Sequence, residues 1–296
     1  MKVLITGGTG LLGKSLIDSK KKEVEIIATY FGNYTIDDND QVKYAKIDVR
    51  DEGGCTNLFQ NHRPDITIHT AGIGSPDFAE TNKEIVWDIN INGTQNILNI
   101  CKRFDSRFIY ISSNGIYDGR NAPYAENDIA EPVNHYGLIK LKGEEITKKT
   151  HISHTIIRPI LMYGWHHTFE RANIVTQAIS KLRNKDVIHA YDDVFTNPLL
   201  NSSCAKAIWT VIDKNIPGIF NIAGADRVSV YELLIKVAET FNLSKNLIIP
   251  VQQGYFNELA KRPKDTSFKT DKMEKVLGIK PLALYDGLAI MKETQT

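Results

Sequence analysis

A glycine-rich segment near the N-terminus constrains the fold of this chain more than any other feature. The apolar run from Val3 to Ile5 leads directly to glycines at 7, 10 and 13, and helical periodicity follows to about Ser19. Glycine permits a tight turn, lets the backbone approach a pyrophosphate and lets a helix pack closely on a strand. The helix N-terminus offers free N–H groups to the anion. The segment therefore predicts a phosphate-binding turn between a first strand and a first helix.

Short apolar runs alternate with amphipathic stretches over the first two-thirds of the chain. Such alternation predicts an α/β fold in which a doubly wound, Rossmann-type parallel sheet carries helices on both faces. The expected strands are residues 3–5, 25–28, 42–47, 65–69, 108–111, 155–157 and 218–222. The expected helices are residues 11–19, 80–103, 135–149, 171–182, 230–241 (with Ser229 as its N-cap) and a short one near 272–277.

The pattern becomes looser after about Tyr163, which predicts a smaller C-terminal lobe interleaved with the main domain. We expect residues 1–163, joined by about 187–222, to form the dinucleotide-binding domain. Residues 164–186 and 223–296 are expected to form the substrate-binding lobe.

Charge and cysteine content narrow the class of protein. The formal net charge of +1 creates no field that would attract nucleic acid or an anionic membrane. The three cysteines lie far apart without metal-ligand spacing, which fits a reducing compartment. No signal peptide is recognised, and no apolar run approaches the roughly 20 residues needed to span a bilayer. The adjacent His166 and His167 are interpreted as a surface pair and not as metal ligands. We therefore expect a cytoplasmic protein without a metal site.

The end of the second strand bears on which dinucleotide is bound. In this type of fold an acidic residue about 20 residues beyond the glycines contacts the ribose 2′-hydroxyl of NAD. Here the strand ends at Tyr30 and Phe31 without Asp or Glu, and Lys14 could pair with a 2′-phosphate. NADP(H) is therefore favoured over NAD(H). The residues of this region expected to bind the cofactor are Gly7, Thr9, Gly10, Leu11, Leu12, Gly13, Lys14 and Tyr30.

Tyr136 and Lys140 lie one turn apart on a predicted helix that follows the fifth strand. Reduction of a carbonyl needs a proton donor near the developing alkoxide, and a neighbouring ammonium lowers the pKa of a phenol. Ser112 and Ser113 end the fifth strand, at the edge where open parallel sheets bind ligands. A serine there can donate a hydrogen bond to a carbonyl oxygen. Ser113, Tyr136 and Lys140 are therefore the predicted catalytic residues.

These motifs together resemble the extended short-chain dehydrogenases/reductases. The resemblance is carried by the segment GGTGLLG, the run from Ile111 to Gly119, the Tyr136–Lys140 pair, and Arg158-Pro159 followed by Tyr163-Gly164. The C-terminal run from Arg262 to Pro281 resembles the tail of one branch, the dTDP-4-dehydrorhamnose reductases, which act on nucleotide sugars.

The resemblance implies roles for individual residues. Ser113 would polarise the carbonyl, Tyr136 would donate the proton, and Lys140 would also hold the nicotinamide ribose. Asp48 and Val49 would contact the adenine. Further cofactor contacts implied by the family are Thr70, Ala71, Gly72, Asn90, Ser112, Tyr136, Lys140 and Arg158. The residues implied to bind the sugar nucleotide are Ser113, Asn114, Tyr136 and Asn173.

Some positions depart from the reductase branch. Ser113 stands where threonine is common, and residues 158–161 read Arg-Pro-Ile-Leu in place of Arg-Thr-Ser-Trp. Asn201-Ser202-Ser203 stands where the branch has an aspartate pair. These departures bear on which sugar is bound. The predicted function is an NAD(P)H-dependent reductase of a 4-keto (deoxy)sugar nucleotide.

Two alternatives stay open. One is a nucleotide-sugar 4-epimerase of the same superfamily, because Pro159 is typical of epimerases; a dehydratase is disfavoured by Asn114-Gly115, where dehydratases carry Asp-Glu. The other is a non-catalytic, NADP-binding regulatory subunit of a different enzyme. The resemblance also suggests a homodimer formed through helices 80–103 and 135–149.

Overall fold

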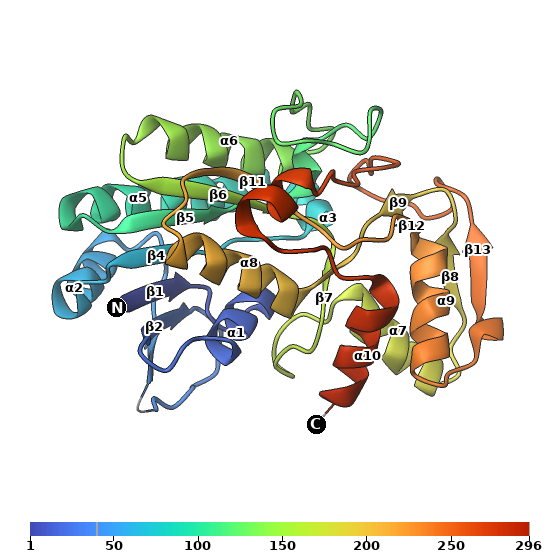
Figure 1. The fold of residues 1–296 in the computed structure, drawn as a ribbon. Coiled ribbons are helices and arrows are strands. Elements are labelled where there is room, and N and C mark those ends of the chain that lie inside the picture. The colour runs from blue at the N-terminus through green and yellow to red at the C-terminus, as the bar shows by residue number, and fades with distance from the viewer. Residues whose placement is uncertain (40, 296) are drawn as a thin grey trace.

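A seven-stranded parallel sheet forms the centre of the molecule (Figure 1). The computed structural model describes residues 1–39 and 41–295. The strands are β1 (Lys2–Thr6), β2 (Glu25–Tyr30), β3 (Val42–Lys46), β4 (Ile66–His69), β5 (Arg107–Ile111), β6 (His154–Pro159) and β11 (Gly218–Ile222). Their order is β11-β6-β5-β4-β1-β2-β3, so the winding reverses between β1 and β4. Such a reversal opens a crevice at the carboxyl ends of the strands. The predicted Rossmann-type sheet is confirmed.

Alternate residues of each strand face opposite layers of helices. Val3 and Ile5 pack in the core beneath α1 (Leu11–Asp18) and α8 (Asn201–Asp213). Leu4 faces the other core, beneath α2 (Glu52–His62) and α5 (Gly93–Phe104). The helix α6 (His135–Lys149) lies beside α5 on this second face, as Figure 1 shows.

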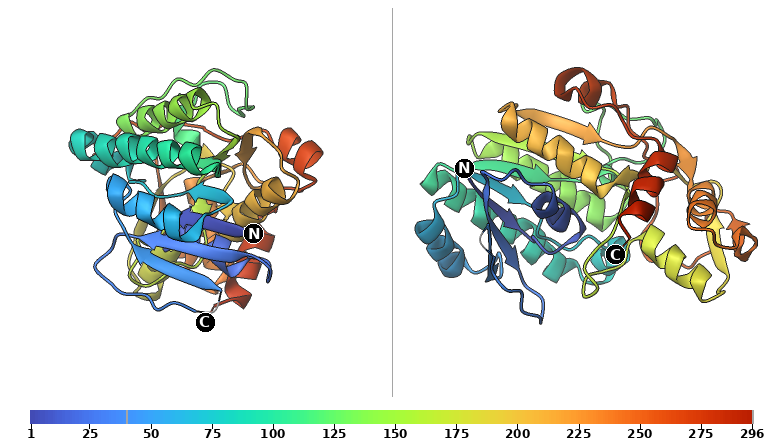
Figure 2. Two further views of the ribbon diagram at one scale, coloured as in Figure 1. Left: turned by 90° about the vertical axis from the view of Figure 1, so that its left-hand side faces the viewer. Right: turned by 60° about the horizontal axis from the view of Figure 1, so that its bottom comes forward.

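A separate hydrophobic core, away from the two faces of the main sheet, holds together the C-terminal lobe. Figure 2 shows its yellow, orange and red segments gathered beside one end of the sheet. Its helices are α7 (Ile174–Arg183), α9 (Val230–Thr240) and α10 (Leu284–Glu293), and β8 (Ile188–Tyr191) pairs in parallel with β13 (Ile248–Val251). Shorter elements are β7 (Met162–Tyr163), β9 (Phe195–Thr196), β10 (Leu199–Leu200), β12 (Val228–Ser229) and η3 (Lys245–Leu247). Ser229 caps α9 in a reciprocal capping box with Glu232, as predicted.

The two lobes are interleaved along the chain. α8 and β11 pack on the main sheet, whereas β8 belongs to the core of the C-terminal lobe. The tail returns to the main sheet, where Phe268 and the segment η4 (Met273–Leu277) join the first core. The domain division expected from the sequence differs from this packing at β8 and at the returning tail.

The long helix expected over residues 80–103 is interrupted. The chain forms α3 (Pro76–Thr81), leaves helical geometry at Asn82 (φ −130°, ψ 49°), and resumes as α4 (Lys83–Trp87). A π-helical turn, η1 (Asp88–Asn92), then leads into α5. Such turns insert one residue and are frequent at functional sites. Helices α2, α8 and α10 were not predicted from the sequence. No helix within residues 1–39 and 41–295 is long and apolar enough to cross a membrane.

Candidate active site

The glycine segment forms a tight cradle between β1 and α1. Gly7 adopts φ +67°, which disfavours any other residue, and a Cβ added to Gly13 would lie 2.5 Å from the Gly7 carbonyl oxygen. Gly10 is the N-cap of α1, where no side chain caps the helix and no acidic residue lies in the first turn. The free N–H groups and the positive end of the helix dipole suit a pyrophosphate. The cradle therefore fits the dinucleotide that the sequence predicts.

The segment after β4 supports the cradle from behind. Thr70 Oγ1 donates to the Thr6 carbonyl oxygen at 2.6 Å and lies 3.1 Å from that of Gly7. Asn90, in the π-helical turn, bonds the backbone of Ile73 in both directions, at 2.8 and 3.0 Å. Gly72, at φ +152°, lies against the Asn90 side chain. Asn90 is buried and fully engaged, so in this structure its side chain positions the loop.

Ser113 and Tyr136 meet at the carboxyl end of β5. Ser113 begins the short helix η2 (Asn114–Ile116) and accepts a hydrogen bond from the Gly115 N–H at 3.1 Å. A Cβ on Gly115 would lie 3.2 Å from the Tyr136 ring and 3.5 Å from Ser113 Oγ. At Gly137, a Cβ would lie 2.0 Å from the Gly115 carbonyl oxygen. These two glycines let α6 begin directly against η2, which brings the tyrosine beside the serine.

Burial shifts the pKa values of both Tyr136 and Lys140. Burial raises the pKa of Tyr136, and only Ser113 and the charge of Arg171 act against it. Lys140 Nζ donates to the Ile111 carbonyl oxygen at 3.0 Å, and burial lowers its own pKa to about 8. Lys140 is not among the groups that lower the pKa of Tyr136 in this structure. Burial dominates both groups.

Arg158 lies beneath the site and serves a different purpose from the one expected. Its guanidinium contacts both oxygens of Glu144 at 2.7 Å and donates to Tyr117 Oη at 2.8 Å. Ser112 Oγ also donates to Glu144, at 2.7 Å. Although burial alone raises the pKa of Glu144, the bonds from Arg158 and Ser112 outweigh it and lower that pKa. The Arg158 and Ser112 side chains are thus engaged in this buried network.

Asp48, one of the two predicted adenine contacts, forms an ion pair with Arg50 that was not expected. Arg50 binds Asp48 at 2.6 Å and Asp88 at 2.9 Å. The hydrogen bonds from Arg50 hold the pKa of Asp48 below its usual value. Val49 is buried against Gly93, the first residue of α5. Arg50 was not predicted from the sequence, although its position two residues after Asp48 was a usable signal.

Two predicted substrate contacts are tied into the protein. Asn114 donates to Thr266 Oγ1 at 2.5 Å and so connects the catalytic loop with the C-terminal tail. Asn173 caps α7 by accepting from Val175 and Thr176, and its Nδ2 donates to the Gly164 carbonyl oxygen at 2.7 Å. The Asn173 side chain therefore has its bonding atoms occupied in this structure.

A cluster that the sequence did not indicate lies over the glycine segment. Glu170, from the C-terminal lobe, accepts hydrogen bonds from Thr9 Oγ1 and Tyr34 Oη, both at 2.7 Å. Tyr34 stacks on Tyr30 at 5.3 Å between ring centroids. The predicted cofactor residue Lys14 points elsewhere and forms an ion pair with Asp18.

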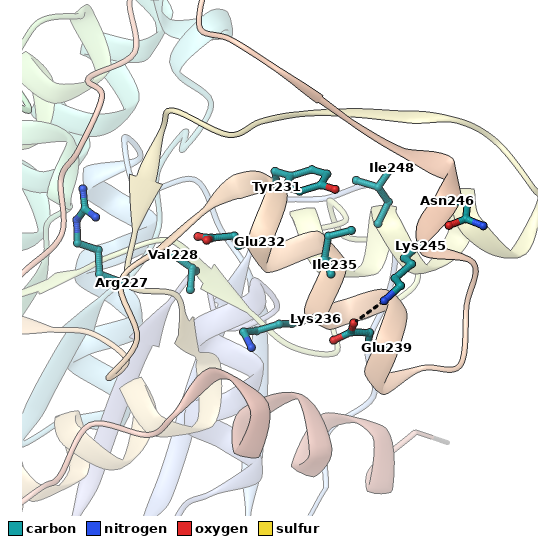
Figure 3. Close-up of a pocket in the computed structure, with 10 residues that line it drawn as sticks. All are labelled: Arg227, Val228, Tyr231, Glu232, Ile235, Lys236, Glu239, Lys245, Asn246 and Ile248. Atoms are coloured by element: carbon teal, nitrogen blue, oxygen red, sulfur yellow. Dashed lines mark hydrogen bonds and ion pairs between the residues drawn. The ribbon is translucent and has the colours of Figure 1, made fainter.

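Two surface hollows lie away from this site. One of about 480 Å³ is lined by Glu52, Asn99, Lys102 and Arg103 on α2 and α5. The other, of about 680 Å³, lies along α9, η3 and β13 (Figure 3). Two of its charged residues, Glu239 and Lys245, pair with each other at 3.2 Å. Neither hollow is lined by Ser113 or Tyr136.

The His166 side chain is hydrogen-bonded within the protein. His166 bonds the His167 carbonyl oxygen at 2.7 Å and Thr176 Oγ1 at 3.1 Å. Within residues 1–39 and 41–295, no group of three His, Cys, Asp or Glu side chains is arranged to hold a metal ion.

The fold and this site define an extended short-chain dehydrogenase/reductase. The glycine cradle follows β1, the serine ends β5, and the tyrosine and lysine begin α6, all at one edge of the sheet. More narrowly, the chain belongs to the RmlD substrate binding domain family, whose model matches residues 1–295.

Relatives with two different names are similar over nearly the whole chain. Methionine adenosyltransferase 2 subunit beta of Rattus norvegicus is 26% identical, with 94% of this chain and 83% of the relative covered. dTDP-4-dehydrorhamnose reductase of Aggregatibacter actinomycetemcomitans is 24% identical, with 95% of this chain and 94% of the relative covered.

Among solved structures, dTDP-4-dehydrorhamnose reductase of Bacillus anthracis, in complex with NADP, superposes with a TM-score of 0.87 at 24% identity and 99% coverage of both chains. UDP-glucose 4-epimerase of Thermotoga maritima also gives a TM-score of 0.87, at 20% identity, with 99% of this chain and 98% of that chain covered. Both likenesses concern the fold.

Proposed function

We propose that this protein is an NAD(P)H-dependent reductase of a 4-keto (deoxy)sugar nucleotide. The observation that carries the proposal is the placement of Ser113 and Tyr136 against one another, at the carboxyl edge of the sheet that also carries the glycine cradle. Family membership over residues 1–295 supports it, as does the name of the reductase from Aggregatibacter actinomycetemcomitans.

Each catalytic residue has a distinct part in this reaction. The nicotinamide, when bound, supplies a hydride to the keto carbon. Ser113 donates a hydrogen bond to the carbonyl oxygen, and Tyr136 delivers the proton to that oxygen. Because burial raises the pKa of Tyr136, the phenol stays protonated at neutral pH and is ready to act as an acid. The Lys140 ammonium is proposed to hold the nicotinamide ribose and to support the negative charge left on Tyr136 after proton transfer.

For the cofactor, NADP(H) is the nucleotide that β2 favours. The strand ends at Tyr30 without an acidic residue, so the strand itself offers no charge against a 2′-phosphate. The NADP named with the Bacillus anthracis structure supports the same choice.

The test is a titration of the purified protein with NADPH and NADH, followed by addition of dTDP-4-keto-6-deoxy sugar. We expect both nucleotides to bind, NADPH more tightly, and the absorbance of the reduced nicotinamide to fall only after the sugar is added. Binding without consumption of reduced nicotinamide would contradict the reductase.

A regulatory subunit is the second candidate, and the names of relatives favour it. Methionine adenosyltransferase 2 subunit beta covers 94% of this chain, and that name describes a component of another enzyme. In this case the protein would bind the cofactor, turn over no keto sugar and form a stable complex with a second protein.

A 4-epimerase would instead retain NAD through purification and interconvert two sugar nucleotides without net change in absorbance.

The proposal includes a cytoplasmic homodimer. The three cysteines are free and buried, which fits a reducing compartment. Ile85 and Trp87 of α4 and Leu138 of α6 expose 38%, 40% and 38% of their surfaces, and these elements belong to the helices expected at the interface. Light scattering at micromolar concentration should give the mass of a dimer; a monomer would remove this part of the proposal.

A further inference from the structure

We propose that Glu170 is a cofactor-specificity residue, which reads the 2′-position of the adenosine ribose from the C-terminal lobe and disfavours a 2′-phosphate. This inference rests on the proposed binding of a nicotinamide nucleotide and adds a residue that lies 161 positions from its partner Thr9.

Three oxygen atoms, one each from Glu170, Thr9 and Tyr34, form the proposed ribose-binding position. The carboxylate oxygen Oε1 of Glu170 accepts from Thr9 Oγ1 and Tyr34 Oη, both at 2.7 Å, and these two hydroxyl oxygens lie 2.8 Å apart. A carboxylate oxygen that accepts from two hydroxyls can also accept from the hydroxyls of a ribose. Thr9 Oγ1 and Tyr34 Oη thus hold an acceptor that a ribose can use.

The same cluster lies at the correct end of the sheet. Thr9 belongs to the glycine segment, and Tyr34 follows the end of β2 and stacks on Tyr30, its last residue. In dinucleotide-binding folds, the acid that contacts the ribose 2′-hydroxyl stands at the end of this second strand. β2 lacks such an acid, and Glu170 brings a carboxylate to the same place from another part of the chain.

Aromatic contacts fix the segment that carries Glu170. Phe169 lies 4.0 Å from Tyr34 between ring centroids, and His167 stacks on Phe169 at 4.9 Å. The Glu170 N–H also donates to the His167 carbonyl oxygen at 3.0 Å, which closes a turn. The segment that carries Glu170 is therefore held against Tyr34 by aromatic packing.

The chemical consequence depends on the charge at the 2′-position. The hydroxyls of NAD(H) can replace Thr9 and Tyr34 as donors to Glu170. A 2′-phosphate offers acceptors and negative charge, so NADP(H) must repel the carboxylate or displace the segment. The end of β2 favours NADP(H), and Glu170 opposes it. Glu170 therefore reduces the difference in affinity between NADP(H) and NAD(H).

The decisive experiment measures dissociation constants for NADH and NADPH by fluorescence titration of the full chain. Glu170→Gln keeps the shape and removes the charge, and Glu293→Gln, on the exposed end of α10, removes one charge elsewhere. We expect Glu170→Gln to tighten NADPH relative to NADH by about 10-fold, and Glu293→Gln to leave the ratio unchanged.

The possible outcomes are separable. A Glu170→Gln ratio within about 2-fold of the wild-type ratio, with both nucleotides still bound, overturns the role of Glu170 and leaves the reductase intact. Failure of the wild-type protein to bind either nucleotide overturns the proposed function and this inference together. If Glu170→Gln does not fold by circular dichroism, Tyr34→Phe removes one of the two donors to the carboxylate. The carboxylate keeps its charge and gains a free acceptor position for a ribose hydroxyl, so the ratio should shift in the opposite direction, towards NADH. An unchanged ratio in Tyr34→Phe would then contradict the inference.

Discussion

Glu144 of α6 and Arg158 of β6 form a two-point ion pair in the core, with both nitrogen–oxygen distances at 2.7 Å. Their side chains are 0% and 4% exposed. The pair joins α6, which carries Tyr136, to β6 of the sheet. It therefore ties α6 to the strand β6.

Glu144→Gln should lower the free energy of unfolding by about 3 kcal/mol, because it leaves the Arg158 guanidinium buried without its counter-charge. Urea denaturation measures the loss. The matched control is Glu145→Gln on the next position of α6, whose partner Lys142 is exposed; this change should cost less than about 1 kcal/mol. Equal losses in the two variants would mean that the buried pair does not stabilise the fold.

Tyr136→Phe should reduce the turnover of a keto-sugar nucleotide at least about 100-fold, because it removes the proton donor and keeps the ring. Nucleotide affinity and the unfolding midpoint should stay near wild type. Tyr285→Phe, an exposed tyrosine on α10, controls for loss of a hydroxyl. Near-normal turnover in Tyr136→Phe would exclude Tyr136 as the acid.

Gly13→Ala should weaken NADPH binding at least about 10-fold, since the added methyl group clashes with the Gly7 carbonyl and opens the cradle. Gly74→Ala is the matched control, because a Cβ at Gly74 has no atom within 4 Å. Titration with NADPH compares the two variants. The cradle would lose its assigned role if both variants bound the nucleotide as the wild type does.

The buried His69 should make the free energy of unfolding decrease in acid. Burial, with help from the charge of Lys140, lowers the pKa of His69 from 6.5 to about 3. Between these values the unfolded chain binds a proton that the native protein does not bind. Stability should therefore fall as the pH decreases from 6.5 towards 3, by about 1.4 kcal/mol per pH unit from this group.

Chemical denaturation at pH 7, 6 and 5 tests this dependence. His69→Asn should remove most of the slope that His69 contributes, whereas His151→Asn should retain it. His151 is exposed and adopts φ +54°, a conformation that asparagine tolerates. A wild-type slope identical to that of His69→Asn would show that His69 does not titrate in this way.

The main elements of the site could be predicted because their signals are local. The glycines at 7, 10 and 13 require a particular turn whatever surrounds them. Tyr136 and Lys140 lie one turn apart on any helix, and the ends of parallel strands share one edge of a sheet. Periodicity likewise located the strands of the main sheet.

Other features were invisible because they depend on contacts between distant residues. Helix α8 was left unassigned, although its buried Ile208 and Val211 pack in the core with the sheet. Arg158 was assigned to the cofactor on resemblance, and only the position of Glu144 shows where its guanidinium points. Helical periodicity also could not reveal the π-helical turn that directs Asn90 toward Ile73.

The sequence by itself determined the class of fold and the set of reactive groups, since turn chemistry and hydrophobic periodicity act between near neighbours. Only the tertiary structure decided the electrostatic state of those groups. Burial raises the pKa of Tyr136 and lowers that of Lys140, and burial is a property of the assembled core. The approach of Glu170 to Thr9 likewise exists only once the two lobes meet, because no local rule places side chains 161 positions apart within a hydrogen bond.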